Sequence, residues 1–498
     1  MSQEVRVRFA PSPTGPLHIG GVRTALYNYL LAKKLGGKML LRIEDTDQNR
    51  FVPGAEQYII ESLQWLGITI DEGVGVGGPH EPYRQSERSA IYQEHAQILL
   101  DAGKAYYAFD TSEELDAMRA TFESQGSAFQ YNAVTRTRLK NSLTLSEEEV
   151  KAKIEAGEPY VIRLKVPAKE EIRFKDLIRD WVHVHSSTID DKVLMKSDGL
   201  PTYHLANVVD DHLMNITHVI RGEEWLPSAP LHVMLYRAFG WENTMPQFAH
   251  LPLLLKPEGN GKLSKRDAEI GGFPVFPLEW TNPEGVKSIG FREEGYLKEA
   301  LINFLAFLGW NPGTEQEIFS LEELTQAFSL ERINKSGAKF DINKAKWYNE
   351  QYLRQQSDEA LASQYLTDFE SDKAVKIVHL FKERVTFPQQ IVSEANALFV
   401  APTSYDQAVI ASKWNDDAKK AITAFKEALP ALENFVADEI KHTLSAELEK
   451  LGIKMGKVMQ ALRVAVTGAG AGPDLMLLME IIGKDAVIQR LDTALTTL

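Results

Sequence analysis

Alternating and helix-spaced hydrophobic positions predict a strand, a helix and a second strand within the first 43 residues. Val5, Val7 and Phe9 alternate with two arginines, which is the period of a strand. Residues 22–35 carry apolar or small side chains at helical spacing and stop at two glycines, and residues 39–43 are a second apolar run. A loop between a strand and a helix N-terminus is where α/β sheets bind nucleotides, because free N–H groups and the helix dipole favour phosphate there.

The pattern changes between residues 103 and 201. Before this range, residues 53–66 and 92–100 have helical spacing and residues 73–78 form a glycine-rich loop. Within it, charged helical stretches at 112–122 and 146–156 are followed by strand-like stretches at 160–166 and 181–185. Ser146 and Glu149 match a capping box. We interpret this range as an insertion between the two halves of a nucleotide-binding domain.

The core pattern resumes near residue 202 and gives way to helices. A helix is predicted from residue 205, a strand at 216–220, a helix at 227–239 and a buried strand at 251–255, which leads into a basic loop at 256–266. Residues 271–290 hold three prolines and four glycines and predict a loop-rich insert, before a helix at 296–308. Later helices are expected at 360–369, 375–381, 405–414, 418–425 and 475–495, the last with a break at Gly483.

Length, composition and charge exclude several classes of protein. A chain of 498 residues is too long for one core and suggests about three to five domains. The sequence has no run of eighteen apolar residues and its polar start lacks a signal-peptide core, so we expect a cytoplasmic protein with no membrane partner. With no cysteine there is no disulfide, thiolate nucleophile or cysteine-ligated zinc. The net charge of −14 argues against indiscriminate nucleic-acid binding but allows a specific RNA partner.

Two short motifs carry candidate phosphate chemistry. His18, at the start of the first helix, can reach a phosphate oxygen, while Gly20 and Gly21 let a base or the backbone come close. Lys262 and Lys265 flank a serine and can clamp phosphates as charge builds. Taken alone, the first motif is more typical of a turn and the second of a solvated surface loop.

Five motifs that occur in a fixed order along the chain favour a functional interpretation over a structural one. The runs F-A-P-S-P-T-G-P-L-H-I-G and L-R-I-E-D-T-D are followed by T-Y-H-L-A-N-V-V-D-D-H, V-I-R-G-E-E-W and K-L-S-K-R. Together they resemble the class I aminoacyl-tRNA synthetases, specifically the bacterial glutamyl-tRNA synthetases. The resemblance covers the whole chain and is sharp up to Arg266.

The resemblance implies a fold and a division into domains. It implies an α/β Rossmann-type catalytic domain with an α+β insertion, followed by an all-α C-terminal anticodon-binding region. The expected ranges are the catalytic domain at 1–104 and 203–260, the insertion that binds the tRNA acceptor end at 105–202, the basic-loop and linking domain at 261–340, and the helical anticodon-binding domain at 341–498.

The resemblance also implies the reaction and its partners. Glutamate attacks the α-phosphate of ATP to give glutamyl-adenylate, and tRNA(Glu) takes the glutamyl group with release of AMP and diphosphate. Mg²⁺ is expected with ATP, because phosphate oxygens commonly hold it. Zinc is not expected, since Tyr106, Tyr107 and Phe109 stand where some relatives have cysteines. We expect a monomer.

The same resemblance assigns roles to individual residues. The groups that act on the phosphates are His18, Lys262 and Lys265, and the ATP site adds Gly20, Gly21, Glu224, Trp225 and Ser264. The amino-acid pocket is lined by Arg8, Ser12, Tyr203, Asn207 and Arg221, with Glu44 receiving the ammonium group. Arg384 lies where the family has an anticodon-contacting arginine, although a plain surface charge is equally compatible. Singly, each pocket residue also fits a structural role in a turn, a cap or the core.

Specificity is expected from an arginine. A planar guanidinium grips a carboxylate through two parallel hydrogen bonds, and a neutral amide satisfies it less well. We therefore hypothesise that Arg8 or Arg221 selects glutamate over glutamine.

Three alternative functions remain open at this point, and a fourth is disfavoured. They are a glutaminyl-tRNA synthetase, which S-P-T-G and a helical C-terminus disfavour, a small-molecule adenylyltransferase, and a non-catalytic RNA-binding protein on the same scaffold. A short relative that glutamylates a modified nucleoside lacks the helical C-terminal region.

Overall fold

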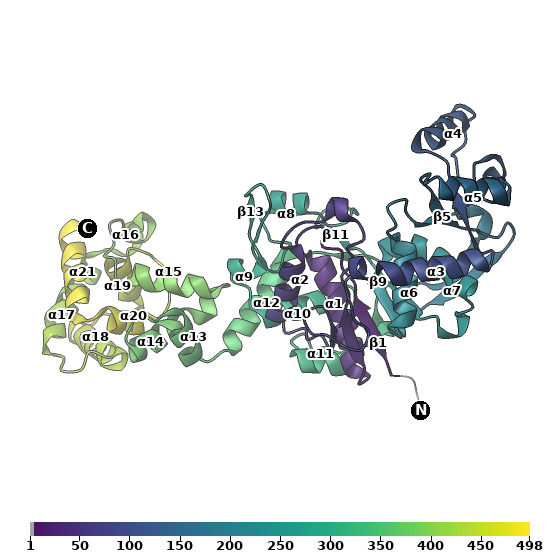
Figure 1. The fold of residues 1–498 in the computed structure, drawn as a ribbon. Coiled ribbons are helices and arrows are strands. Elements are labelled where there is room, and N and C mark those ends of the chain that lie inside the picture. Colours follow the sequence, from purple (N-terminus) through teal and green to yellow (C-terminus); the bar gives the residue numbers. More distant parts are fainter. Residues whose placement is uncertain (1–3) are drawn as a thin grey trace. The chain divides into compact units, whose positions relative to one another are not determined.

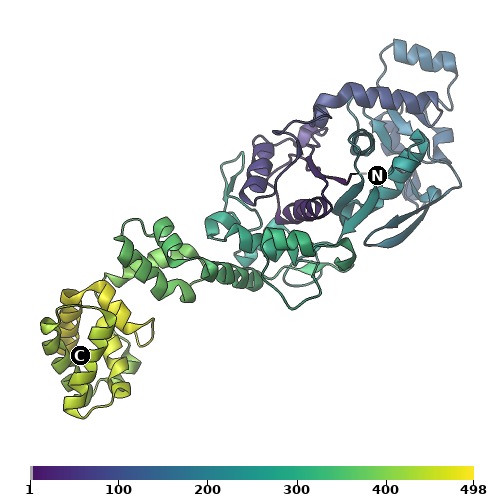
Figure 2. The ribbon, with the colours of Figure 1, turned by 90° about the horizontal axis from the view of Figure 1, so that it is seen from below.

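The computed structural model describes residues 4–498, and its backbone contacts divide the chain into two units. The first unit comprises the residues up to 294 together with 301–342, and the second comprises 295–300 and 343–498. In Figures 1 and 2 the first unit combines strands and helices, whereas the second, drawn in green to yellow, consists of helices.

A seven-stranded sheet forms the centre of the first unit. Its order is β3-β2-β1-β9-β10-β6-β7, parallel except for the last pair. The strands are β1 (Arg6–Phe9), β2 (Lys38–Leu41), β3 (Glu72–Gly73), β9 (His218–Gly222), β10 (Gln247–Leu251), β6 (Glu171–Asp176) and β7 (Asp180–His185). The N-terminal strand, helix and strand predicted from the sequence are confirmed.

The chain order places a topological switch point between β1 and β9. Helix α1 (Ile19–Lys34) connects β1 to β2, whereas α7 (Ala229–Phe239) connects β9 to β10 in the opposite direction along the sheet. Because crossovers between parallel strands are right-handed, these two helices cover opposite faces. Ligands of such sheets bind beyond the strand ends at the switch point, which is where β1 and β9 end here.

The range expected to be an insertion is divided between two sheets. Strands β4 (Ala105–Ala108), β5 (Val161–Leu164) and β8 (Val193–Met195) make a separate antiparallel sheet. The helices of this range are α4 (Ser112–Ser124) and α5 (Glu147–Glu155), and the capping box of Ser146 and Glu149 is present. The β6–β7 hairpin instead extends the central sheet, because β6 pairs with β10.

The remaining elements of the first unit show where prediction and structure differ. The run predicted as one strand at 251–255 is interrupted at Pro252, so that β10 ends at Leu251 and a short β11 (Leu254–Leu255) pairs with β14 (Ala338–Lys339). The segment at 271–290 contains a small hairpin of β12 (Trp280–Thr281) and β13 (Lys287–Ser288). The other helices are α2 (Ala55–Trp65), α3 (Ser89–Asp101), α6 (Tyr203–Leu213), α8 (Lys265–Gly271), α9 (Phe291–Glu294), α10 (Lys298–Ala306) and α11 (Leu321–Ala327).

The second unit is a bundle around one apolar core that includes Phe381, Phe425, Leu462 and Met479. The helices predicted there are present, and the break at Gly483 separates α20 from α21. The sequence predicted a helical region over 341–498 but gave no separate bounds for α12, α15, α18 and α19. The helices are α12 (Ile342–Gln355), α13 (Asp358–Tyr365), α14 (Ser371–Phe381), α15 (Pro388–Leu398), α16 (Gln407–Lys413), α17 (Asp416–Ala428), α18 (Ala437–Leu451), α19 (Met455–Thr467), α20 (Leu475–Ile482) and α21 (Lys484–Thr497).

Candidate functional site

A cavity of about 600 Å³ lies at the switch point of the central sheet. Its walls come from the ends of β1 and β9, the start of α1, the first turns of α6 and the loop that follows β11. Most of the residues predicted from the sequence line it, namely Arg8, Ser12, His18, Gly20, Gly21, Glu44, Tyr203, Asn207, Arg221, Glu224, Trp225 and Lys262. The two distant motifs therefore converge on one cavity.

His18 caps the helix at the edge of this cavity. Its Nδ1 accepts a hydrogen bond from the Gly20 N–H at 3.1 Å, so a neutral ring carries its proton on Nε2. Burial, helped by the Lys262 ammonium, lowers the pKa of His18 to about 4, which keeps the ring neutral at pH 7. Nε2 is buried and has no partner among residues 4–498. His18 thus offers one unpaired N–H donor.

The backbone at this helix start differs from our expectation. We predicted that free N–H groups near Gly20 would hold phosphate, but the first three each have a partner. Ile19 N donates to the Val275 carbonyl at 2.9 Å, Gly20 N to His18 Nδ1, and Gly21 N to the His18 carbonyl at 2.8 Å. The carbonyl of Val275 comes from the loop-rich segment, whose contact with α1 no periodicity predicts. The side-chain donors therefore matter more here than the backbone.

Lys262 supplies a cation to the same cavity. Its Nζ lies 2.8 Å from Glu224 Oε1, and both side chains are half-exposed. Although burial disfavours the carboxylate, the Lys262 hydrogen bond holds the pKa of Glu224 below its usual value. A surface pair of this kind is worth little in stability and exchanges easily for a better anion.

Ser264 and Lys265 do not line the cavity. Ser264 caps α8 and forms a capping box with Asp267, so the basic loop predicted to reach residue 266 ends two residues earlier. Lys265 stands in the first turn of α8, with its Nζ 3.8 Å from Glu269. Of the two lysines, only Lys262 faces the cavity in this conformation.

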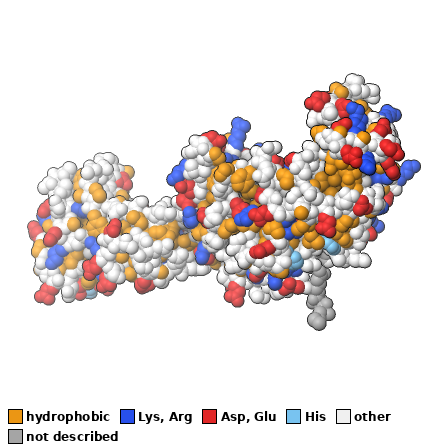
Figure 3. All heavy atoms as spheres, in the orientation of Figure 1, with side chains coloured by type: hydrophobic (Ala, Val, Ile, Leu, Met, Phe, Trp, Pro, Cys, Tyr) orange, Lys and Arg blue, Asp and Glu red, His pale blue; other side chains and the backbone are white. Residues whose placement is uncertain are grey.

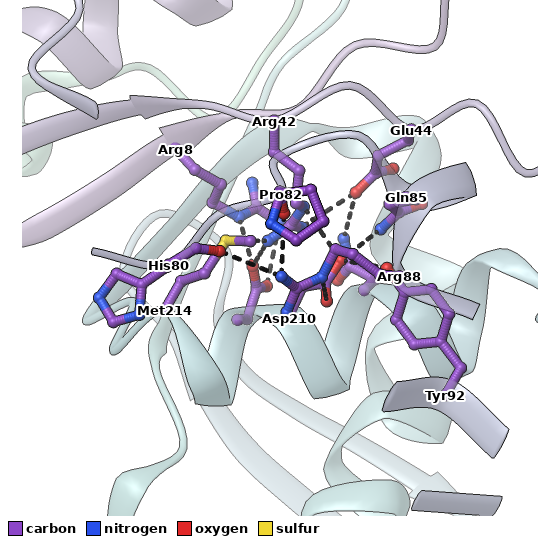
Figure 4. A network of polar contacts seen from close by, with 12 residues as sticks. Arg8, Arg42, Glu44, His80, Pro82, Gln85, Arg88, Tyr92, Asp210 and Met214 are labelled. Carbon is purple, nitrogen blue, oxygen red and sulfur yellow. Dashed lines mark hydrogen bonds and ion pairs between the residues drawn. The ribbon is translucent and has the colours of Figure 1, made fainter. Parts of the chain in front are cut away.

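A buried network of charges supports the wall of the cavity formed by Arg8 and Glu44 (Figure 4). Asp211 accepts from Arg8 Nε at 3.0 Å and from Arg42 Nη1 at 2.8 Å. Arg42 also donates to Glu44 at 3.0 Å, and Asn207 donates to the same carboxylate oxygen at 3.0 Å. Arg8 is therefore already neutralised by a carboxylate of the protein.

The next layer of this network holds Asp210. It accepts from Arg88 Nε at 2.8 Å, from Gln85 Nε2 at 2.9 Å and from the Tyr92 hydroxyl at 2.8 Å (Figure 4). These contacts tie α6 to α3 and to the turn before it. Asp210 thus fixes the helix from which Tyr203 and Asn207 point into the cavity.

Glu44 is desolvated in this setting. Burial raises its pKa even though Arg42 and Arg8 lie nearby and oppose the rise. An incoming ammonium group would relieve that cost, which is consistent with the predicted role of Glu44.

Arg221 has a different environment from Arg8. Its guanidinium donates to the Tyr203 hydroxyl at 2.6 Å, to His250 Nε2 at 3.1 Å and to the Trp225 carbonyl at 3.3 Å. No carboxylate among residues 4–498 pairs with it. It is 5 % exposed, so its positive charge is buried and uncompensated. Such a group favours an anionic ligand.

The sequence missed several residues of this site. Asp210 and Asp211 were inside a quoted motif but received no role. Helical spacing held a signal for Asp211, because Tyr203, Asn207 and Asp211 are four residues apart and share one face of α6. Arg42 and His250 gave no signal, since their importance depends on the order of the strands.

The second unit has its own cavity, of about 410 Å³. Arg384, Arg463 and Arg490 lie in its wall. Arg490 is held by three backbone carbonyls, whereas Nη1 of Arg463 is buried with no partner among residues 4–498. Burial lowers the pKa of Arg463, and repulsion from the positive charge of Arg384 lowers it further. Arg384 is thus part of a basic cavity rather than an isolated surface charge.

The fold and the site define a class of protein before any comparison. A parallel sheet with a histidine at its first helix start and a lysine loop across the switch point is the class I synthetase catalytic domain expected above. The chain matches the family described as "tRNA synthetases class I (E and Q), catalytic domain" over residues 4–347, and "Anticodon binding domain" over 353–495.

Full-length relatives specify the family. The chain is 64 % identical to a glutamate–tRNA ligase of Cytophaga hutchinsonii, over 100 % of this chain and 98 % of the relative, and 52 % identical to one of Porphyromonas gingivalis strain W83, over 100 % of both. A solved glutamate–tRNA ligase of Elizabethkingia meningosepticum, in complex with its amino acid, has a TM-score of 0.96 at 51 % identity, covering 100 % of both chains. The chain belongs to the glutamate–tRNA ligases, which confirms the resemblance.

Two further observations concern membranes and metals. No helix within residues 4–498 combines the length and the apolar character needed to cross a bilayer. Within the same residues, no three histidine or acidic side chains converge as metal ligands.

Proposed function

We propose that this protein activates glutamate with ATP and transfers the glutamyl group to tRNA(Glu). One α-carboxylate oxygen of glutamate attacks the α-phosphorus and diphosphate leaves. A ribose hydroxyl at the 3′ end of the tRNA then attacks the activated carbonyl and AMP leaves. The observation that carries the proposal is the unpaired Nε2–H of His18, which shares a cavity with Lys262 and an uncompensated arginine.

The phosphate side of the cavity supplies positioning and charge. Phosphoryl chemistry needs little more from side chains. His18 donates to a phosphate oxygen, and Lys262 exchanges Glu224 for the triphosphate. Mg²⁺ would be carried by the phosphate oxygens of ATP, where it would help to neutralise the charge that develops on the leaving diphosphate.

The amino-acid side distinguishes the two candidate arginines. Arg8 is paired with Asp211, whereas Arg221 contacts only neutral groups. An uncompensated guanidinium gains more from the side-chain carboxylate of glutamate than from the amide of glutamine. We therefore assign the selection of glutamate to Arg221 and the ammonium group to Glu44.

A further cavity, in the first unit, supports tRNA binding by the insertion. It has a volume of about 430 Å³ and shares Tyr203 with the main cavity. Its wall contains Arg119, Arg163, Lys192 and the rings of Phe129 and Tyr131. Cations together with aromatic faces suit unstacked nucleotides. We assign it to the acceptor end of the tRNA. On the face drawn in Figure 3, acidic and basic side chains are mixed over both units. Together with the net charge of −14, this favours RNA binding through local groups over binding through a broad positive field.

The basic cavity of the second unit is assigned to an anticodon base. Replacing Arg384 by leucine is expected to raise the KM for tRNA(Glu) by about 10-fold, the cost of one hydrogen bond to a charged group. The KM values for ATP and glutamate should not change. Initial rates of charging at varied tRNA concentration measure this. Lys441→Leu, a change of an exposed cation on α18 outside that cavity, is the control, and equal effects of both variants would argue against the assignment.

Charging of purified tRNAs tests the whole proposal. Glutamate with tRNA(Glu) should give glutamyl-tRNA, AMP and diphosphate, and glutamine should not replace glutamate. ATP–diphosphate exchange with each amino acid, with and without tRNA, separates the alternatives. Exchange that needs glutamine identifies a glutaminyl-tRNA synthetase, and exchange that no tRNA affects favours a small-molecule adenylyltransferase.

A further inference from the structure

The buried arginine at the end of β9 is held through a histidine by a carboxylate two strands away. Arg221 Nε donates to His250 Nε2 at 3.1 Å, and His250 Nδ1 lies 2.6 Å from Asp176 Oδ2. The side chains of His250 and Asp176 are fully buried. Arg221, His250 and Asp176 belong to β9, β10 and β6, which are neighbours in the sheet.

The sheet register brings these three residues together. Arg221 is the direct partner of His250, and Asp176 is the direct partner of Phe248, two residues before His250. Residues that pair directly, or lie two apart on one strand, share a face of the sheet. The Arg221 guanidinium and the His250 ring also lie near Phe248. The alignment is therefore built into backbone pairing.

The hydrogen bonds define the protonation of the histidine. Arg221 can only donate, so His250 Nε2 must accept and the ring proton is on Nδ1. Burial lowers the pKa of His250, and the nearby positive charge of Arg221 lowers it further. The hydrogen bond to Asp176 opposes this change but does not outweigh it. Asp176 Oδ1 accepts from the backbone N–H groups of Ile178 and Arg179 at 2.9 and 2.8 Å. The arrangement is a carboxylate, a neutral imidazole and a guanidinium in line.

We propose that Asp176 and His250 are positioning residues that hold Arg221 ready for the glutamate side chain without neutralising it. The inference rests on the proposed role of Arg221. A carboxylate in direct contact with Arg221 would compete with the substrate, as Asp211 does at Arg8. The neutral His250 ring is held by Asp176 and in turn fixes the orientation of the Arg221 guanidinium. The ring also keeps the Asp176 carboxylate from contacting the guanidinium directly. Arg221 thus retains its charge for the ligand.

Two substitutions at one position separate the two hydrogen bonds. In His250→Asn the short amide can still reach Asp176, but Arg221 Nε loses its acceptor. In His250→Gln the longer amide presents an acceptor near the position of Nε2. We expect His250→Asn to raise the KM for glutamate about 10- to 100-fold and to lower the preference for glutamate over glutamine. His250→Gln should restore both to within about 5-fold of the original protein. The KM for ATP should not change in either.

Asp176→Asn provides an independent variant. It keeps the shape but removes the charge that fixes the imidazole tautomer, so the KM for glutamate should rise about 3- to 10-fold. Melting curves with and without glutamate report folding and binding together. Equal KM values for His250→Asn and His250→Gln, or an unchanged KM in Asp176→Asn, would overturn the inference. If the asparagine variant at position 250 does not fold, the result for Asp176→Asn decides. Failure of the unaltered protein to activate glutamate would instead reject the proposed function.

Discussion

Replacing Arg221 by leucine is expected to lower kcat/KM for glutamate by about 10³-fold, because removing one partner of a buried ion pair costs about 3–5 kcal/mol. The loss should be much smaller for glutamine, whose amide gains less from a guanidinium. The ratio of the two kcat/KM values should therefore fall toward one. ATP–diphosphate exchange in the presence of tRNA, with each amino acid in turn, measures the ratio.

Arg8→Leu and Arg237→Leu are the comparisons for Arg221. Arg8→Leu should also reduce activity, because it leaves Asp211 with one cation fewer, but the ratio should move less than in Arg221→Leu. Arg237 lies on α7 outside the cavity and pairs with Glu242 at 3.5 Å, so its replacement should leave both rates unchanged. A ratio that stays constant in both Arg8→Leu and Arg221→Leu rejects an arginine as the selecting group.

Replacing His18 by asparagine is expected to slow adenylate formation by about 10²- to 10³-fold, the loss typical of one preorganised donor in an active site. Asparagine is a good N-cap residue and can still accept from Gly20 N, so the free energy of unfolding should change little. Only the Nε2 donor is lost. Single-turnover rates and melting temperatures, measured on the same preparation, separate the two roles of His18.

Further variants at position 18 sharpen the test. His18→Ala should lose both the donor and the cap, and therefore about 1 kcal/mol of stability as well. His18→Gln carries an amide donor near the position of Nε2 and should recover part of the rate. His183→Asn, a change on the exposed face of β7, is the matched control. Because the pKa of His18 is about 4 in the ligand-free protein, the ring is neutral there from about pH 6 to 8 and should add no step to the pH profile of kcat/KM in that range. A normal adenylation rate in His18→Asn would contradict the assignment.

The elements that the sequence predicted best are those with uninterrupted periodicity. β1 and α1 were predicted in the right places although both are buried on nearly all sides. Arg6 and Arg8, which alternate with Val7 and Phe9 in β1, are buried as well and pair with Glu72 and Asp211. The run at 251–255 was predicted as one strand because its apolar residues continue across Pro252, but the structure has two strands there. Proline lacks an N–H group, which ends the ladder of β10 at Leu251. The spacing of Ile440, Leu444 and Leu448 in α18 held a usable signal that was overlooked.

The residues of the site also fall into two groups, those that the sequence predicted and those that it did not. Residues within continuous motifs, such as Arg8, Asn207 and Glu44, were assigned through the family resemblance that those motifs carry, and all three line the cavity. Asp176 and His250 were not, because their contact depends on which strands are neighbours. Asp176 also lies in a range that resembles an insertion. The covered N–H of Ile19 depends on a loop whose path has no periodicity.

The pairing of β6 with β10 limits how this protein can be dissected. Residues 105–202 look like a cassette that could be cut out and its ends rejoined, since the sheet of β4, β5 and β8 stands apart from the main one. Excision would also take away β6, turn β10 into an unprotected edge and leave His250 without its anchoring carboxylate. A minimal catalytic fragment must therefore keep the β6–β7 hairpin, even though that hairpin lies within residues 105–202.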